Sequence, residues 1–174
     1  MPELIVIIII IVLLIVIFII NTLKKEKNKI SELNHFCNQL KELNYEIINR
    51  TETCYDLEVK NNNMTFLIKL ITIPEFAEIQ INNKTTWEIK YGAGNTIGKP
   101  QPYSKYLKNI ASFMNLETTS NQIKVVVASP TPKKMVKYVN ECEIEFVTHN
   151  TDVYGVKLIS YKNLELFKLY QNKN

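Results

Sequence analysis

Several residue types are scarce in this chain, and each scarcity excludes a class of site. His35 and His149 are the only histidines among 174 residues, which excludes a zinc site built mainly from histidine. Cys37, Cys54 and Cys142 lie far apart and form no C-x-x-C pair, a pattern that predicts reduced, mostly packed thiols. The four glycines do not have the spacing of a dinucleotide fingerprint, and no G-x-S-x-G nucleophile motif occurs. No nucleophile–base–acid set is therefore predicted.

Charge is also missing from one long stretch near the N-terminus. Residues 4–20 form an unbroken run of seventeen apolar residues between Glu3 and Lys24. As a helix this run spans about 25 Å, which is close to the thickness of a bilayer core. Because no small-x-small cleavage site follows the run, an uncleaved anchor over 1–22 is favoured over a signal peptide. The sequence thus predicts a transmembrane helix in contact with membrane lipid.

Lysines follow this run and none precede it. The positive-inside rule therefore predicts a single-pass protein of the cell membrane, with its N-terminus outside and its C-terminal domain in the cytoplasm. The formal charge of +4 is unevenly distributed, since residues 24–29 contribute +3 and Glu3 contributes −1. The remaining chain is only +2, whereas a dedicated nucleic-acid binder carries a stronger basic surface. Strong non-specific binding to DNA is not expected.

Residues 23–50 have a helical pattern. Apolar and small residues recur at spacings of three and four over 23–49, and Phe36 and Leu43 widen the stripe that they form. We expect this stripe to pack on the following sheet, because it is broader than a strict coiled-coil seam. The alternative is a short coiled coil that makes a dimer through 23–49.

Residues 51–174 are predicted to form a mixed α/β domain around a central sheet. Alternating or continuous apolar segments separated by Asn, Gly and Pro turns indicate strands. The expected strands are 54–60, 65–73, 77–81, 86–91, 123–128, 143–148 and 156–160. Helices are expected over 102–115 and 132–140, the second opened by Pro132.

Lys69 lies within the apolar strand Phe-Leu-Ile-Lys-Leu-Ile, where an ammonium group is costly to bury without a partner. The preceding strand offers that partner in Asp56. A carboxylate and a lysine on adjacent strands suit a metal-assisted phosphodiesterase, in which carboxylates hold Mg²⁺ and the lysine steadies the attacking water or the phosphate. A structural ion pair is the simpler alternative.

One order of segments is informative: Tyr55-Asp56, a turn, residues 66–69 and then residues 99–108. This order resembles the PD-(D/E)XK nuclease superfamily, and within it the nuclease-related domain. The resemblance covers roughly residues 40–160, mostly as an order of elements. It implies a restriction-endonuclease-like mixed sheet flanked by helices, with a site that uses Mg²⁺ and binds nucleic acid. By this resemblance the catalytic candidates are Asp56 and Lys69, and the binding candidates are Lys99, Gln101, Lys105 and Lys108.

One residue departs from the pattern of that superfamily. The Glu of its Glu-x-Lys motif falls on Leu67, which cannot bind a metal, so the Mg²⁺ site is expected to be weak or absent. Glu46, expected on the first helix, is the candidate for a replacement metal ligand beside Asp56. A second register reads Glu58-Val59-Lys60 as the motif, but this places it at an Asn-rich turn, a poor support for a rigid site.

Three functions follow as hypotheses. The first is a membrane-anchored domain with a degenerate nuclease-like fold that binds nucleic acid at the membrane and needs no cofactor. The second is a protein-interaction or scaffold module that binds a partner through the helix at 23–49 or a sheet edge. The third is an active Mg²⁺-dependent nuclease, against which Leu67 argues. Resemblance of fold alone does not decide among them.

Overall fold

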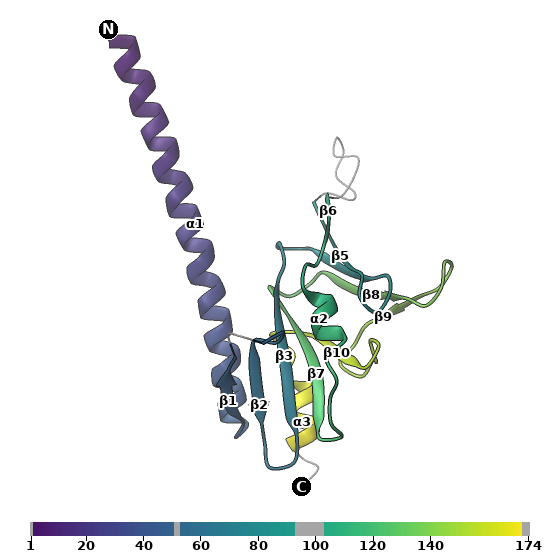
Figure 1. The fold of residues 1–174 in the computed structure, drawn as a ribbon. Helices are drawn as coiled ribbons and strands as arrows, with labels where there is room; N and C mark the ends of the chain where they lie inside the picture. Colours follow the sequence, from purple (N-terminus) through teal and green to yellow (C-terminus); the bar gives the residue numbers. More distant parts are fainter. Residues whose placement is uncertain (1, 51–52, 93–102, 172–174) are drawn as a thin grey trace.

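The computed structural model describes residues 2–50, 53–92 and 103–171, without the side chains of 2–10, 21, 25, 26, 28 and 29. A long N-terminal helix, two five-stranded sheets and two short helices make up the described fold (Figure 1). The predicted mixed α/β class is confirmed. A single central sheet was expected, however, and the strands instead divide between two mixed sheets, called sheet A and sheet B below.

Sheet A has the strand order β1-β2-β3-β7-β10. The strands β1, β2 and β3 pair antiparallel, whereas β3, β7 and β10 are parallel to one another. The predicted continuous apolar strand is β3, and it lies in the middle of the sheet, where both faces are covered. The bounds of these strands are β1 Glu46–Asn49, β2 Leu57–Lys60, β3 Thr65–Thr72, β7 Gln122–Ser129 and β10 Val156–Ser160.

Sheet B has the strand order β6-β5-β4-β8-β9, with β6 and β9 as its two edges. The predicted hairpin of β4 and β5 is confirmed, and Asn83 fixes its turn by accepting hydrogen bonds from the backbone N–H groups of Thr85 and Thr86. The bounds are β4 Glu78–Ile81, β5 Trp87–Tyr91, β6 Tyr103–Tyr106, β8 Lys134–Tyr138 and β9 Ile144–Phe146.

Two predicted helices are wrong. Within 102–115, residues 103–106 form β6 on the edge of β5, and only α2, Ile110–Met114, is helical. Within 132–140, residues 134–138 form β8, because the neighbouring strand β4 supplies parallel backbone pairing. A helix-opening proline is only a local signal, and tertiary pairing overrides it. A short helix at the C-terminus, α3 Glu165–Gln171, was not predicted.

The first helix, α1, runs from Pro2 to Glu42 and ends earlier than predicted. Asn44 adopts a positive φ of 59°, and the N–H of Tyr45 donates back to the carbonyl of Leu40. This left-handed residue closes the helix, and the chain then enters β1. The predicted helix over 23–49 is therefore wrong at its C-terminal end.

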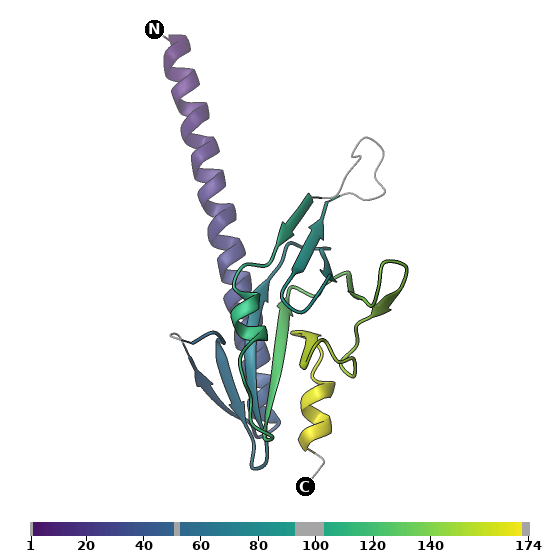
Figure 2. The same cartoon turned by 45° about the vertical axis from the view of Figure 1, so that its right-hand side comes forward.

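Hydrophobic cores lie on both faces of sheet A. Figure 2 shows the helices that lie against the strands. On one face Phe36 and Leu40 of α1 and Phe167 of α3 pack with Phe66 of β3, and the rings of Phe66 and Phe167 are 5.0 Å apart. On the other face α2 and sheet B cover the strands, with Trp87 fully buried. The expected packing of the α1 stripe on the sheet is therefore confirmed for its C-terminal part.

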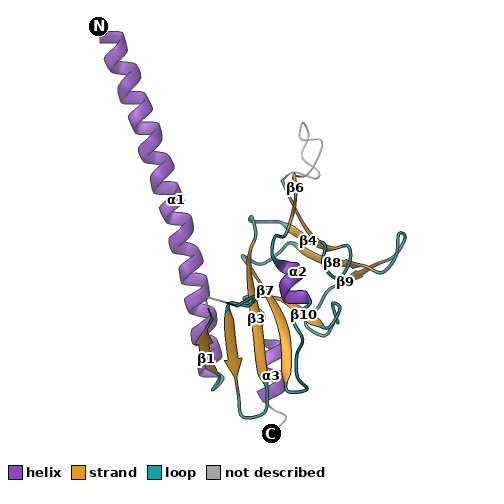
Figure 3. Ribbon diagram, viewed as in Figure 1, coloured by secondary structure: helices purple, strands orange, loops and turns teal. Residues whose placement is uncertain are grey.

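The N-terminal part of α1 extends away from both sheets (Figure 3). The side chains from Ile11 to Ile20 are all apolar and 44–72% exposed. Leu23 and Ile30 are exposed as well. The residues with described structure include no helix that is long and apolar enough to cross a membrane, so the predicted span over 1–22 is unsupported there.

Candidate functional site

Asp56 and Lys69 lie opposite each other at the start of β2 and within β3, because Leu57 pairs with Ile68. The Nζ of Lys69 donates to Oδ1 of Asp56 at 3.1 Å, and the backbone N–H of Leu70 donates to Oδ2 at 2.7 Å. The two side chains are 38% (Asp56) and 19% (Lys69) exposed. The structure thus brings the two predicted residues together, while their catalytic role stays a prediction.

Each oxygen of Asp56 accepts one hydrogen bond in this arrangement, and a metal ion would compete with the cation of Lys69 for the carboxylate. Leu67, at the position of the missing carboxylate, is buried in the core. Within the described part of the chain, no three His, Cys, Asp or Glu side chains form a group that could hold a metal ion. Since Mg²⁺ commonly takes one or two carboxylates together with several waters, the Mg²⁺ site at Asp56 stays a prediction.

Glu58, the carboxylate of the second register, lies opposite Leu67 on β2 and is also buried. Its oxygens pair with Lys60 at 2.6 Å and with Arg50 at 2.8 Å. Hydrogen bonds from Lys60 and Arg50 hold the pKa of Glu58 below its ordinary value, against the opposing effect of burial. Glu58 is therefore a paired structural carboxylate, and Lys60 of the same register is its partner.

Glu46 lies on β1 and not on the first helix, so its expected placement was wrong. It pairs in register with Lys60, at the far end of β2 from Asp56. Four residues of strand separate these ends by roughly 13 Å, too far for both carboxylates to bind one ion. The structure does not assemble the predicted pair of metal ligands.

The face of β1 to β3 that carries these residues is balanced in charge. The alternation of side chains and the strand register place six charged residues on it. Three are cations and three are carboxylates, namely Arg50, Lys60 and Lys69 against Glu46, Asp56 and Glu58. This face therefore has cationic donors for a phosphate but no surplus of positive charge.

Lys124 was missed by the sequence analysis. It lies on β7 opposite Leu67 and is only 7% exposed. Its Nζ donates to the carbonyls of Met114 at 2.8 Å and Leu116 at 2.9 Å, at the end of α2. Burial lowers the pKa of Lys124, and repulsion from Lys84 lowers it further. A lone lysine in the apolar segment Ile-Lys-Val-Val-Val was the available signal, the same one that singled out Lys69.

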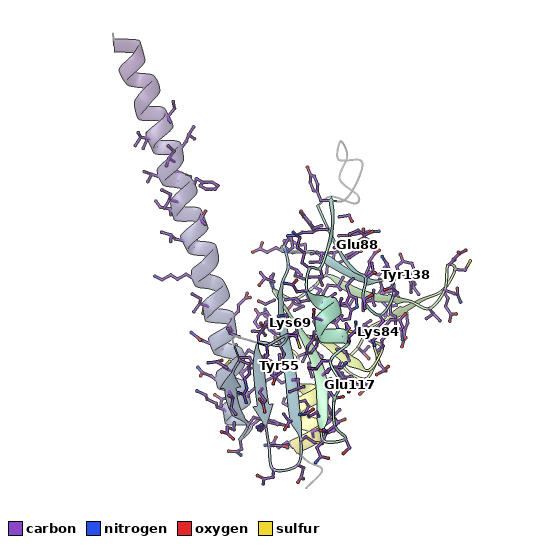
Figure 4. All side chains as sticks on the ribbon, in the orientation of Figure 1. Tyr55, Lys69, Lys84, Glu88, Glu117 and Tyr138 are labelled. Atoms are coloured by element: carbon purple, nitrogen blue, oxygen red, sulfur yellow. The ribbon has the colours of Figure 1, made fainter. Side chains whose placement is uncertain are left out.

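Lys84 projects from the turn between β4 and β5 and is exposed. Figure 4 shows Tyr55 and Lys69 on one side of α2 and Lys84 on the other in this view. None of the ion pairs among the described residues joins Lys84 or Lys124 to a carboxylate. Lys84 is thus an accessible cation near the buried Lys124.

Of the four remaining binding candidates, two lie within the described residues. Lys99 and Gln101 lie outside the described residues. Lys105 lies on β6 of sheet B, and Lys108 follows that strand, both exposed. Among the described residues, no ion pair connects Lys105 or Lys108 to Asp56. Their role in nucleic-acid binding stays a prediction.

The chain matches no protein-family model, no curated protein and no solved structure. Its function is therefore inferred from its own residues and fold.

Proposed function

We propose that this protein is a membrane-tethered domain with a nuclease-like arrangement of residues that binds nucleic acid without cleaving it. The observation that carries the proposal is the state of Asp56, whose two oxygens bond Lys69 and the backbone of Leu70. A carboxylate bonded in this way supports the sheet, and Mg²⁺ would have to compete with the cation of Lys69 for it. The burial of Leu67 at the neighbouring position supports the same interpretation.

The tether is supported by the apolar run over residues 4–20. In the part of this run whose side chains are described, Ile11 to Ile20, every side chain is exposed. An exposed apolar surface of this length is unfavourable in water and marks a contact with lipid or protein. Lysines directly after the run favour lipid, because cations collect on the cytoplasmic side of a span. The domain would then face the cytoplasm, with the N-terminus outside.

The exposed cationic side chains on the face of β1 to β3 that carries Asp56 are the proposed phosphate contacts. The side chains of Arg50 and Lys60 are 42% and 37% exposed, and each has more N–H donors than its bonds to Glu58 use. Lys84 is a further exposed cation, near the buried Lys124 and on the other side of α2 from Lys69 in Figure 4. Since the carboxylates on this face offset the cations, binding should be modest in affinity and sensitive to salt.

The test is a titration of the full chain in detergent with labelled single- and double-stranded DNA, with and without Mg²⁺ or Mn²⁺. We expect binding that weakens as salt rises and no cleavage in any condition. Lys60→Gln with Lys84→Gln should weaken binding and reduce its salt dependence, whereas Lys105→Gln with Lys108→Gln is the matched control on sheet B. Metal-dependent cleavage that disappears in Asp56→Ala and in Lys69→Ala would show a working nuclease. Absence of any salt-sensitive binding would refute the nucleic-acid function.

A second candidate function is binding of a protein partner at β9. This edge strand exposes Ile144 and Phe146, and an unpaired edge can accept a strand from a partner. Its hairpin also carries Glu141, Glu143 and Glu145, which would repel nucleic acid and attract a basic peptide. A labelled peptide of alternating Lys and Val is the probe, and its binding should be lost in Phe146→Ser.

A further inference from the structure

The outer end of the hairpin of β5 and β6 exposes aromatic and basic side chains. All four residues of β6 are exposed, and Tyr103 and Tyr106 are exposed by 70% and 60%. The ring of Tyr103 stacks on that of Tyr91 across the hairpin, with centroids 5.7 Å apart. Figures 1 and 2 both show this end turned toward the side of the domain from which the apolar part of α1 projects.

The distribution of these residues does not suit packing against another protein layer. Successive side chains of a strand point to opposite faces, so Tyr103 and Lys105 lie on one face and Tyr106 on the other. A strand that packs on a neighbour is apolar on one face only. Tyrosine on both faces, with lysine between, is typical of a segment at a membrane surface, where the ring lies among the headgroups and the ammonium binds anionic lipid.

The geometry of α1 brings the domain close to that surface. The helix is continuous from its apolar part into the core, where Phe36 and Leu40 are fully buried. The carboxylate of Glu32 also accepts hydrogen bonds from Ser129 and Tyr161. From Ile20 to Glu32 the helix rises only about 18 Å. A domain joined to the apolar run by one continuous helix of this length would lie close to the bilayer surface.

We propose that the β5–β6 hairpin is a second membrane contact, in which Tyr103 and Tyr106 enter the headgroup region and Lys105 binds anionic headgroups. This inference rests on the proposed tether. It assigns Lys105 to lipid, whereas the phosphate contacts of nucleic acid lie on the face of sheet A. Two contacts would fix the orientation of the domain on the membrane.

The experiment compares one fluorescent probe at two positions of the full chain in vesicles of phosphatidylcholine and phosphatidylglycerol. In the first protein, Ser104→Cys is combined with Cys142→Ser, and an environment-sensitive dye labels position 104. In the control, the same dye labels the native Cys142, which is exposed in the loop between β8 and β9 at the opposite edge of sheet B. Cys142→Ser alone measures labelling of the half-buried Cys37 and Cys54. Flotation measures the tether, and quenching by nitroxide-headgroup lipid measures the hairpin contact.

We expect both labelled proteins to float and the probe at 104 to be quenched several-fold more than the probe at 142. Tyr106→Ser should reduce the quenching at 104 without changing flotation. Equal quenching at both positions in floating protein would overturn the hairpin contact and leave the tether intact. Failure to float would overturn the tether and this inference with it. A probe at 104 that responds to DNA but not to nitroxide lipid would make the hairpin a nucleic-acid contact instead.

Discussion

The bonds of Asp56 predict an order of stabilities among three variants. In Asp56→Ala the backbone N–H of Leu70 loses its acceptor at 2.7 Å, and Lys69 loses its ion-pair partner. A partly buried N–H left without a partner costs about 1–3 kcal/mol. Lys69→Met removes only the ion pair, which is partly exposed and contributes about 0–1 kcal/mol. Asp56→Asn retains an oxygen that can accept from the N–H of Leu70, so its loss of stability should lie between those of Asp56→Ala and Lys69→Met.

Urea unfolding of the full chain in detergent measures these differences, with the fluorescence of Trp87 as the signal. Trp87 is the only tryptophan, and it is fully buried between the sheets. We expect Asp56→Ala to lower the free energy of unfolding by about 1–2 kcal/mol more than Lys69→Met does.

The opposite order would refute the structural interpretation of this pair. Catalytic sites are commonly strained, so removal of a catalytic charge often leaves stability unchanged or raises it. If Asp56→Ala or Lys69→Met stabilised the protein, the pair would be poised for chemistry instead of supporting the sheet. The nuclease activity of the wild type would then need to be examined with each divalent metal in turn.

Three further predictions concern other parts of the molecule. Phe36→Ala should lower the free energy of unfolding by about 3–5 kcal/mol, because Phe36 is fully buried. Phe18 is exposed, so Phe18→Ala should change this free energy by less than about 0.5 kcal/mol. Equal losses of the two variants in urea unfolding would contradict this prediction. The pKa of Lys124 in the folded state lies below its ordinary value of 10.5. At pH values between these two pKa values, Lys124 therefore binds more protons in the unfolded chain than in the folded one. The stability of the wild type relative to Lys124→Met should therefore rise with pH up to about 10.5, and a flat difference would refute the burial of this charge. Burial raises the pKa of Cys37, so iodoacetamide should modify the exposed Cys142 first, which mass spectrometry of the peptides can check.

Much of the strand pattern could be predicted because it depends on local alternation and turn residues. Asn61 accepts hydrogen bonds from the N–H groups of Asn63 and Met64, which closes the predicted turn between β2 and β3. That turn also fixes the register that places Asp56 opposite Lys69. A hairpin of adjacent strands joins nearby residues, so its contacts are readable from the sequence.

Errors arose where distant pairing decided the structure. Residues 134–138 form a strand between β9, its hairpin neighbour, and β4, which lies more than fifty residues earlier in the chain. The pairing with β4 is the part that local sequence does not contain. The neighbour of Leu67 on its other side is Lys124, which depends on the parallel pairing of β3 with β7. Neither spacing nor composition contains that register, so the buried lysine was missed.

The sequence by itself determined the apolar N-terminal run, the mixed α/β class, most strand positions and the meeting of Asp56 with Lys69. These features follow from hydrophobic periodicity and short turns, whose energies are local. Only the tertiary structure decided that the strands form two sheets, that Glu46 lies far from Asp56, and that Glu58 and Lys124 are buried beside Leu67. Those outcomes depend on which distant surfaces pack together, because burial and pairing across the core outweigh the preferences of single segments.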